Sequence, residues 1–457
     1  MHDRSTPPAP RDSFASTLGA FTATVGSAIG LGNIWMFPYR TGTNGGAAFV
    51  LTYLLAVALV ALPVMVVEHA IGRRMRLDAV RAYGKVVPGQ PWWSLVGWAG
   101  FVSALLIMAF YTDVAGWVFA YIAKSAVAAV EGRTLAPEAF GALASGTWEP
   151  LSWQLGVVVL TTSIIAAGVS GGIEKATKLL MPVLFVLLVV CDVRALTLPG
   201  AMEGVEYLFR PDLSKLTGTV LLAALGLAFF KLSLGMGTMT TYGSYLPDRV
   251  KIVPNAARVA LADTAISLLA GLAIFPALFA FGGEPTQGPG LLFVTIPLVF
   301  SKMPLGGVFT VLFFVLASIA TIGAMVSIAE VPVAWLVAKG RVRRPVAAAL
   351  TGCAMFALGV TATLSQNPVL GDVKVFGKNL FDLYEFTSSN VLLPVGGVAI
   401  AIVGGWLVRK SDFLAELAKG EKGVPWYARV MHLFVRWVAP VLTLLVLLWS
   451  LGVLGKK

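Results

Sequence analysis

The chain has 457 residues, of which 57% are hydrophobic and 12% are charged, and its formal net charge is +11. This composition excludes a soluble globular protein, because apolar runs long enough to cross a bilayer, about 20 residues each, recur along the sequence. The basic excess lies mostly in short loops between those runs rather than on a face with stacking aromatics, so a nucleic-acid partner is excluded as well.

Eleven apolar segments predict an all-α membrane protein with eleven transmembrane helices. The polar stretches between the segments are too short to fold alone. We therefore expect a cytoplasmic N-terminal segment over residues 1–15 and a single domain over residues 16–455. In chain order the segments cover residues 17–39, 47–72, 95–125, 153–170, 175–197, 219–245, 257–281, 305–338, 345–365, 384–408 and 428–454.

Lysine and arginine residues gather in alternate loops, and this distribution sets the expected orientation of the chain. They occur in the N-terminal segment and after the second, fourth, sixth, eighth and tenth apolar segments. If the segments alternate in direction, all these loops lie on the cytoplasmic side. The N-terminus is then cytoplasmic and the C-terminus lies outside, with the lipid bilayer as the surrounding partner.

The metal-binding residue types show no ligand pattern. Cys191 and Cys353 both lie inside apolar segments, where a small buried hydrophobic side chain is the simplest interpretation. The three histidines have no metal-ligand spacing. We therefore expect no metal site and no cofactor.

Two segments carry closely spaced glycines at their centres. The first segment reads GSAIGLGN over residues 26–33, and the sixth reads SLGMG over residues 233–237. Glycine weakens a helix by about 1 kcal/mol relative to alanine, and freed backbone groups in a membrane must line a cavity or be buried in protein. The alternative is that these glycines only allow helices to pack closely.

The two glycine-rich segments are five apart in chain order. This spacing is expected of inverted repeats that each carry a broken helix, with a binding site between them near the middle of the membrane. The first repeat would cover about residues 16–200, the second about 215–410, and an extra helix would cover about 428–454. The free N–H groups of a half-helix favour a carboxylate, and free carbonyls favour an ammonium group.

The chain resembles the neurotransmitter:sodium symporter family, in particular its bacterial amino-acid transporters. The resemblance covers roughly residues 11 to 455. It is carried by GSAIGLGNIWMFPYRTGTNGGAAF at 26–49, LPVMVVEHAIGRR at 62–74, GGIEKATKLLMP at 171–182, AFFKLSLGMGTMTTYGSY at 228–245 and SSNVLLPVGG at 388–397. The resemblance implies the LeuT-type fold, a 5+5 inverted repeat with unwound helices 1 and 6, in a bacterial inner membrane protein that is a monomer or a weak homodimer.

The resemblance also implies a substrate site. The N–H groups of Leu31 and Gly32 and the hydroxyl of Tyr111 would hold a carboxylate. The carbonyls of Ala28 and Phe230, together with Ser233, would hold an amine. Gly30 stands where amine-transporting members carry an aspartate, which favours a substrate with its own carboxylate. The side-chain pocket would be lined by Ile107, Phe230, Met236, Ala324 and Ile328.

The expected cation sites depart from the family pattern. At the first sodium site Asn33 matches the family, but Lys231 and Asp263 replace a hydroxyl residue and an asparagine. A lysine would repel a bound sodium ion in a low-dielectric site. We expect the Lys231 ammonium to occupy this site with Asp263 as its counterion, and the substrate carboxylate to face it; the alternative is that Lys231 extends to an interface.

The second sodium site would use the carbonyls of Gly26 and Ile29. Its hydroxyl positions become Gly323 and Ala324 in one alignment, or Ala320 and Thr321 in a second alignment shifted by three residues. The first alignment leaves neither cation site intact. Coupling to protons and exchange without coupling are therefore both open, and Ser267, a residue typical of chloride-dependent members, does not establish a chloride requirement.

The gate positions differ from the family too. Met36 replaces the outer arginine, whereas Glu385 matches its acidic partner. Arg11 matches the inner arginine, but the residue aligned with its acid is Ala338. Phe14 replaces a tryptophan, and Tyr245 and Glu330 remain near the inner gate. Hydrophobic closure would then matter more than ion pairs.

These features favour a secondary active transporter of a small to medium apolar amino acid, with weak or absent sodium dependence. A conventional sodium-coupled symporter is the closest alternative. A substrate sensor that has lost transport is a different class. An enzyme is not expected, because Glu68, Asp113 and Glu330, the other notable intramembrane acids, form no triad or metal set.

Overall fold

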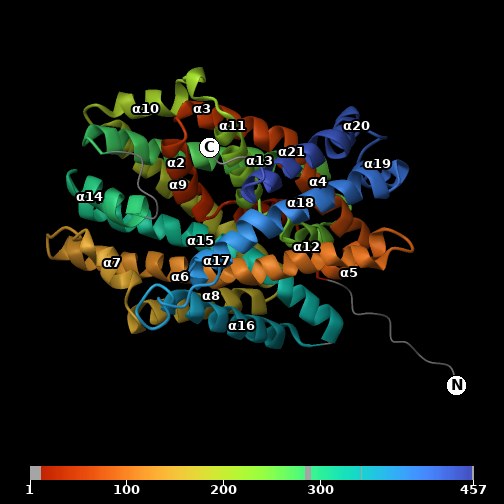
Figure 1. Cartoon of the computed structure of the whole chain (residues 1–457), viewed down its shortest axis with the longest axis horizontal. Coiled ribbons are helices and arrows are strands. Elements are labelled where there is room, and N and C mark those ends of the chain that lie inside the picture. Colours follow the sequence, from red (N-terminus) through yellow and green to blue (C-terminus); the bar gives the residue numbers. More distant parts are fainter. Residues whose placement is uncertain (1–11, 284–289, 341, 455–457) are drawn as a thin grey trace.

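The computed structural model describes residues 12–283, 290–340 and 342–454, and it is built from helices (Figure 1). In the first half of the chain every predicted segment is helical. The helices are α1 (Thr17–Ala28), η1 (Gly32–Met36), α2 (Phe37–Thr43), α3 (Ala47–Ala56), η2 (Val57–Ala61), α4 (Leu62–Met75), α5 (Ala79–Val86), η3 (Pro91–Trp93), α6 (Ser94–Val130), α7 (Glu138–Ala144), α8 (Trp148–Ala166), η4 (Val169–Glu174), α9 (Lys175–Leu196) and α10 (Ala201–Phe209).

The second half continues the pattern, and its predicted segments are helical as well. Its helices are η5 (Leu213–Lys215), α11 (Gly218–Lys231), α12 (Thr238–Tyr245), α13 (Ile252–Ala280), η6 (Leu291–Thr295), α14 (Ile296–Ser301), α15 (Gly306–Gly340), α16 (Arg344–Leu364), α17 (Leu380–Glu385), η7 (Phe386–Leu392), α18 (Leu393–Ile402), η8 (Val403–Leu407), α19 (Lys410–Leu417), α20 (Trp426–Leu433), η9 (Phe434–Val438) and α21 (Ala439–Ser450).

The all-α prediction is confirmed at the level of helices long enough to cross a bilayer. Among the described residues nine helices are sufficiently long and apolar, and a tenth is obtained if the bent pair Thr17–Ala28 and Gly32–Thr43 counts as one span. The sixth predicted segment is divided into α11 and α12, and neither half reaches this length alone. Eleven spans therefore remain a prediction.

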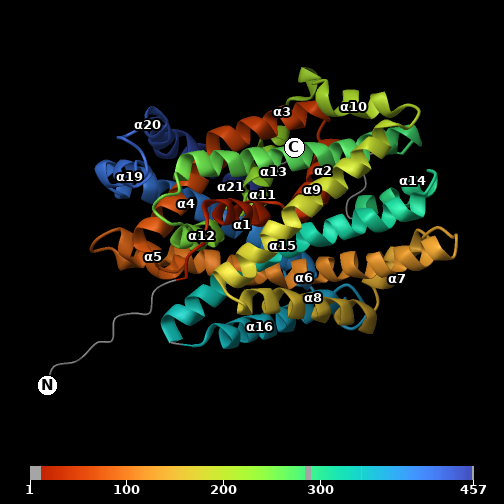
Figure 2. The ribbon, with the colours of Figure 1, turned by 180° about the vertical axis from the view of Figure 1, so that it is seen from behind.

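Short helices gather at the two ends of the bundle. Figures 1 and 2 show α5, α19 and α20 at one end and α7, α10 and α14 at the other. The loops that bear the predicted cytoplasmic lysines and arginines lie at the first of these ends, which we call the inner end. The opposite end is called the outer end. Both views place α6, α8 and α16 along one side of the bundle, where α6 packs against α8, α15 and α16.

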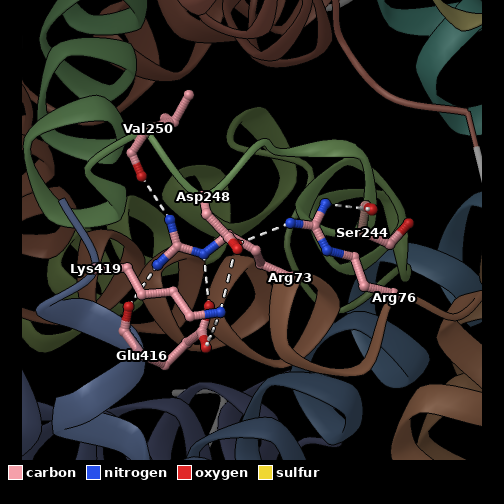
Figure 3. Close-up of polar contacts among 7 residues, drawn as sticks. All are labelled: Arg73, Arg76, Ser244, Asp248, Val250, Glu416 and Lys419. Carbon is pink, nitrogen blue, oxygen red and sulfur yellow. Dashed lines mark hydrogen bonds and ion pairs between the residues drawn. The ribbon is translucent and has the colours of Figure 1, made fainter.

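A network of charged side chains ties the inner end of α4 to α19 and to the loop before α13 (Figure 3). The fully buried Arg73 guanidinium donates to the carboxylate and carbonyl of Glu416 and to the carbonyl of Val250. Lys419 lies 3.0 Å from Glu416 and 3.3 Å from Asp248. Because these contacts join segments distant in sequence, they hold α19 and the loop before α13 against α4.

Partial burial would raise the pKa of the Asp248 carboxyl, but Lys419 and Arg76 hold this pKa below its usual range. Arg76 donates to Asp248 at 2.9 Å and to the carbonyl of Ser244 at 3.4 Å (Figure 3). The Asp248 side chain is 63% exposed, so solvent screens the pair.

Candidate functional site

The first helix is interrupted at the glycine-rich motif. Helix α1 ends at Ala28, η1 begins at Gly32, and the two parts are bent by 52°. The freed Gly30 N–H donates to the Asn33 side chain at 3.1 Å, and the Leu31 N–H donates to the Tyr111 hydroxyl at 3.0 Å. Side chains thus replace the missing helical partners, as a helix break inside a membrane requires.

The sixth segment is interrupted between Lys231, the last residue of α11, and Thr238, the first residue of α12. Ser233, Gly235 and Gly237 have φ angles of 53°, 80° and 78°, which turn the backbone out of the right-handed helix. The carboxylate of Glu68 enters this break from α4. It accepts from the Gly235 N–H at 2.8 Å and from the Thr240 N–H at 3.1 Å. Glu68 therefore stabilises the start of α12.

The two breaks face each other across a small cavity of about 20 Å³. This volume accommodates roughly one water molecule, so a larger solute must displace the lining side chains. Nine of the predicted substrate residues line it, together with Ser27 and Lys231. The predicted residues are Ala28, Gly30, Gly32, Tyr111, Phe230, Ser233, Met236, Ala324 and Ile328.

A second cavity of about 40 Å³ lies beside the first, and Gly32, Tyr111 and Phe230 line both. It also contains the predicted residues Leu31, Met36 and Glu385, and the unpredicted residues Trp35, Phe110 and Val114. Ile107 lines neither cavity, although it is fully buried one turn before Tyr111. Phe230 and Tyr111 are thus the side chains that separate the two cavities.

The Lys231 side chain is fully buried and its ammonium group lies among α3, α11 and α13. It lies 3.1 Å from the Asp263 carboxylate, donates to the Tyr53 hydroxyl at 2.8 Å, and also donates to the Ser267 hydroxyl. The ring of Tyr53 lies 4.5 Å from the ammonium nitrogen. Because an ammonium has three N–H donors, these contacts use all of them.

Asp263 and Asn33 complete this cluster. The Asp263 carboxylate accepts from the Tyr53 hydroxyl at 2.8 Å and from the Asn33 amide at 2.7 Å, in addition to Lys231. The side-chain oxygen of Asn33 accepts from the Gly30 N–H, so the same residue joins the charge pair to the first helix break. A buried charge pair with this many hydrogen bonds is held in one place.

The positions of the predicted second cation site also meet. Gly323 lies so close to the Gly26 carbonyl that an added Cβ would approach that oxygen to 2.6 Å. The Cβ of Ala324 lies 3.0 Å from the Cβ position of Gly30. Neither Gly323 nor Ala324 has a side-chain hydroxyl. Thr321 instead donates its hydroxyl to the carbonyl of Ala317.

An ion pair at the inner end was missed by the sequence analysis. Arg344, at the start of α16, lies 2.6 Å from Glu330 and 3.2 Å from Asp12. Tyr245 donates to the other oxygen of Glu330 at 2.6 Å, and the buried Phe14 donates its N–H to the Tyr245 carbonyl. The predicted gate residue Arg11 lies outside the described residues. Ion pairs therefore join more segments at the inner end of the molecule than the sequence suggested.

Tyr53 was also missed as a partner of Lys231. A tyrosine inside an apolar segment usually needs a hydrogen-bond partner for its hydroxyl, and this signal was available in the second segment. Arg344 was counted only as a cytoplasmic charge. Its bond with Glu330 depends on how α15 and α16 are joined, which composition and spacing do not specify.

Comparison with known proteins identifies relatives over nearly the whole chain. The family described as the sodium:neurotransmitter symporter family matches residues 11–131 and 144–456. The uncharacterized sodium-dependent transporter YhdH of Bacillus subtilis is 39% identical, over 97% of this chain and 98% of its own length. An uncharacterized sodium-dependent transporter of Haemophilus influenzae is 33% identical, over 96% of this chain and 98% of its own length.

A solved structure is similar at the level of the whole fold. The crystal structure of MhsT in complex with L-phenylalanine is 41% identical to this chain in sequence. It superimposes with a TM-score of 0.87 and covers 96% of this chain and 100% of the MhsT chain. The resemblance inferred from the motifs is thereby confirmed.

Proposed function

Because the chain belongs to the sodium:neurotransmitter symporter family, we propose that it is a secondary active transporter of an amino acid that works by alternating access. The family is one of transporters and not of enzymes. An amino-acid substrate is supported mainly by the cavity between the two helix breaks, where backbone groups of both breaks and Tyr111 meet. The relative MhsT is seen in complex with L-phenylalanine.

We further propose the complete architecture of the family for this chain. It comprises eleven transmembrane helices with unwound helices 1 and 6 and the 5+5 inverted repeat, in one domain over residues 16–455. The protein lies in the bacterial inner membrane, as a monomer or a weak homodimer. Its N-terminus is in the cytoplasm and its C-terminus is outside, in agreement with the lysine and arginine distribution.

The substrate is a zwitterion with a small to medium apolar side chain. Its carboxylate is bound by the N–H groups of Leu31 and Gly32 and by the Tyr111 hydroxyl. Its amine is bound by carbonyls of the two breaks and by Ser233. Gly30 supplies no acid that could replace the substrate carboxylate. The apolar side chain lies against Phe230, Met236, Ala324 and Ile328, which line the cavity.

Lys231 and Asp263 replace the first sodium ion. The support is the 3.1 Å pair that the two side chains form with no exposed surface. Since the ammonium already uses its three donors within the cluster, it acts as a fixed charge near the substrate carboxylate and not as a direct ligand. The Asp263 carboxylate also supplies a negative charge beside Ser267, so no chloride ion is needed there.

The second cation site lacks side-chain hydroxyls at Gly323 and Ala324, which supports weak or absent sodium dependence. A conventional sodium-coupled symporter remains the second candidate, because YhdH and other relatives are described as sodium-dependent. A sensor without transport is the candidate from a different class. Its cradle would bind an amino acid without moving it across the membrane.

Substrate recognition is tested by counterflow exchange in liposomes with a panel of labelled amino acids that includes L-phenylalanine. The Y111F variant lacks the Tyr111 hydroxyl. It should raise the concentration of the preferred amino acid that gives half-maximal exchange about tenfold to a hundredfold, since a hydrogen bond to a charged group contributes about 1.5–3 kcal/mol. Y121F is the matched control, because Tyr121 is a buried tyrosine of the same helix outside both cavities. Binding without exchange would favour the sensor.

A further inference from the structure

Asp113 is a fully buried carboxylic acid in the middle of α6, two residues after Tyr111. Both of its carboxyl oxygens are without a hydrogen-bond partner among the described residues. The polar side chain that faces it is Thr363 of α16. The substrate cavity lies on the other side of α6, where Tyr111 points. Asp113 therefore takes no part in the substrate cradle.

The surroundings of Asp113 contain no compensating charge within the described chain. The charged residues of the helices packed against α6 lie toward the ends of those helices or, like Glu385, in the second cavity. Lys124 pairs with Glu149 at the outer end, and Arg344 pairs with Glu330 at the inner end. An isolated carboxylate buried in a membrane is strongly destabilising, so the acid is neutral and holds a proton.

Thr363, the polar neighbour of Asp113, is hydrogen-bonded to a further polar pair that can support both states of the acid. The Gln154 amide donates to the Thr112 hydroxyl at 2.9 Å, and the Thr363 hydroxyl donates to the Gln154 carbonyl oxygen at 3.2 Å. A protonated Asp113 can donate to one of these oxygens. After the proton leaves, the hydroxyl and amide N–H groups can turn toward the carboxylate.

Further buried polar residues follow Thr363 in the sequence toward the outer end. Thr363 is one residue from the end of α16, and the buried Ser365 and Asn367 follow directly. Asn367 reaches the carbonyl of Gly146 and the hydroxyl of Thr147 in the outer loop before α8. Gln154 is six residues into α8, or about 9 Å from its outer end. These positions place the cluster nearer the outer end of α8 and α16 than the inner end, so the outer side is the side from which the proposed site would take up a proton.

We propose that Asp113, with Gln154 and Thr363, is a proton-binding site through which amino-acid transport is coupled to a proton gradient. The proposal rests on the proposed transport function and names its coupling ion. The step is a simple transfer: the carboxylic acid releases H⁺ and becomes a carboxylate, and it takes up H⁺ again from the outer side. No other reactant takes part.

The test uses the full chain in liposomes in sodium-free choline buffer, with the outside one pH unit more acidic than the lumen. One proton per substrate allows at most about tenfold accumulation of labelled amino acid. The wild-type protein should accumulate substrate and acidify the lumen, as followed with an enclosed pH dye. D113N, which cannot release a proton, should lose both effects. Size-exclusion profiles verify folding.

D192N is the matched control, because Asp192 is a buried acid of α9 whose oxygens also have no partner among the described residues. It should accumulate substrate like the wild type. Counterflow separates the two claims: a wild type that does not exchange amino acids refutes the transport function. If the wild type exchanges amino acids but does not accumulate them along the proton gradient, the proton site is overturned. Accumulation by D113N also overturns it, and so does loss of exchange in folded D113N.

Discussion

Asp263 and Asp113 are both fully buried, yet their electrostatic settings are opposite. The Asp263 carboxylate accepts hydrogen bonds from Asn33 and Tyr53 and pairs with Lys231. Asp113 has no hydrogen-bond partner in the part of the chain that the structure describes. A compensated acid remains charged and serves as a fixed part of the site, whereas an uncompensated acid must hold a proton.

In this account, the two aspartates serve two separate roles that a single bound ion has in a sodium-coupled transporter. One role is to fill the space between the first helix break and α13, which Lys231 does with a covalently attached positive charge. The other role is to bring energy to transport, which an immobile ammonium cannot do. If the account is right, substitutions at the two aspartates have distinct effects on stability and coupling.

The largest effect is expected when Lys231 alone is removed. K231M leaves the Asp263 carboxylate buried without its counterion, which should destabilise the fold by about 3–5 kcal/mol. Thermal unfolding in detergent measures this loss. The double variant K231M/D263N removes both charges and should recover most of the lost stability. Equal destabilisation in the single and double variants would show that the two side chains are not coupled.

A change of ion requirement is expected when the family residues are restored. K231T/D263N provides a hydroxyl and an amide at the first cation site, beside Asn33 and Ser267. Uptake by this variant should be stimulated by sodium, and by chloride as well, because the Asp263 charge is gone. The effect is read as the ratio of uptake in sodium chloride to that in choline gluconate. A ratio unchanged from wild type would contradict the replacement of an ion by Lys231.

A smaller effect is expected at the inner end. R344A removes the cation that joins Glu330 to Asp12, so the inner gate should open more often. Loss of a charge-assisted hydrogen bond of about 1.5 kcal/mol corresponds to roughly tenfold more labelling of a cysteine that is buried while the gate is closed. The reporter is T241C, at a buried position of α12 one turn before Tyr245, in a background with Cys191 and Cys353 replaced by serine. Unchanged labelling would show that apolar packing alone closes this end.

The smallest effect is expected for Asp248, whose side chain is mostly exposed. D248N should change stability by at most about 1 kcal/mol, since solvent screens its pairs with Lys419 and Arg76. Because the pKa of Asp248 is lower in the folded state, its carboxylate stabilises the folded protein above the unfolded-state pKa. This stabilisation disappears as the pH falls through the folded-state pKa. Thermal unfolding of wild type and D248N at neutral and acidic pH measures this. A large loss at neutral pH would mean that the network of Figure 3 acts as a unit.

The sequence predicted the helical segments, because runs of apolar residues are local signals, and its paired glycines lie where the first and sixth segments are divided. The family motifs also selected most of the residues that line the cavity between the two breaks. Tyr53 and Arg344 were not predicted as partners of Lys231 and Glu330, because each contact joins helices whose relative rotation is set by packing. Asp113 was noticed but not assigned, since its isolation is a property of its neighbours.

The most direct test of the central claim is uptake of a labelled amino-acid mixture by the reconstituted wild-type protein in sodium and in choline buffer at one fixed pH. The account predicts equal uptake in both buffers, because the Lys231 ammonium occupies the place of the first sodium ion beside Asp263. Uptake that requires sodium would contradict it and would make the protein a conventional sodium-coupled symporter.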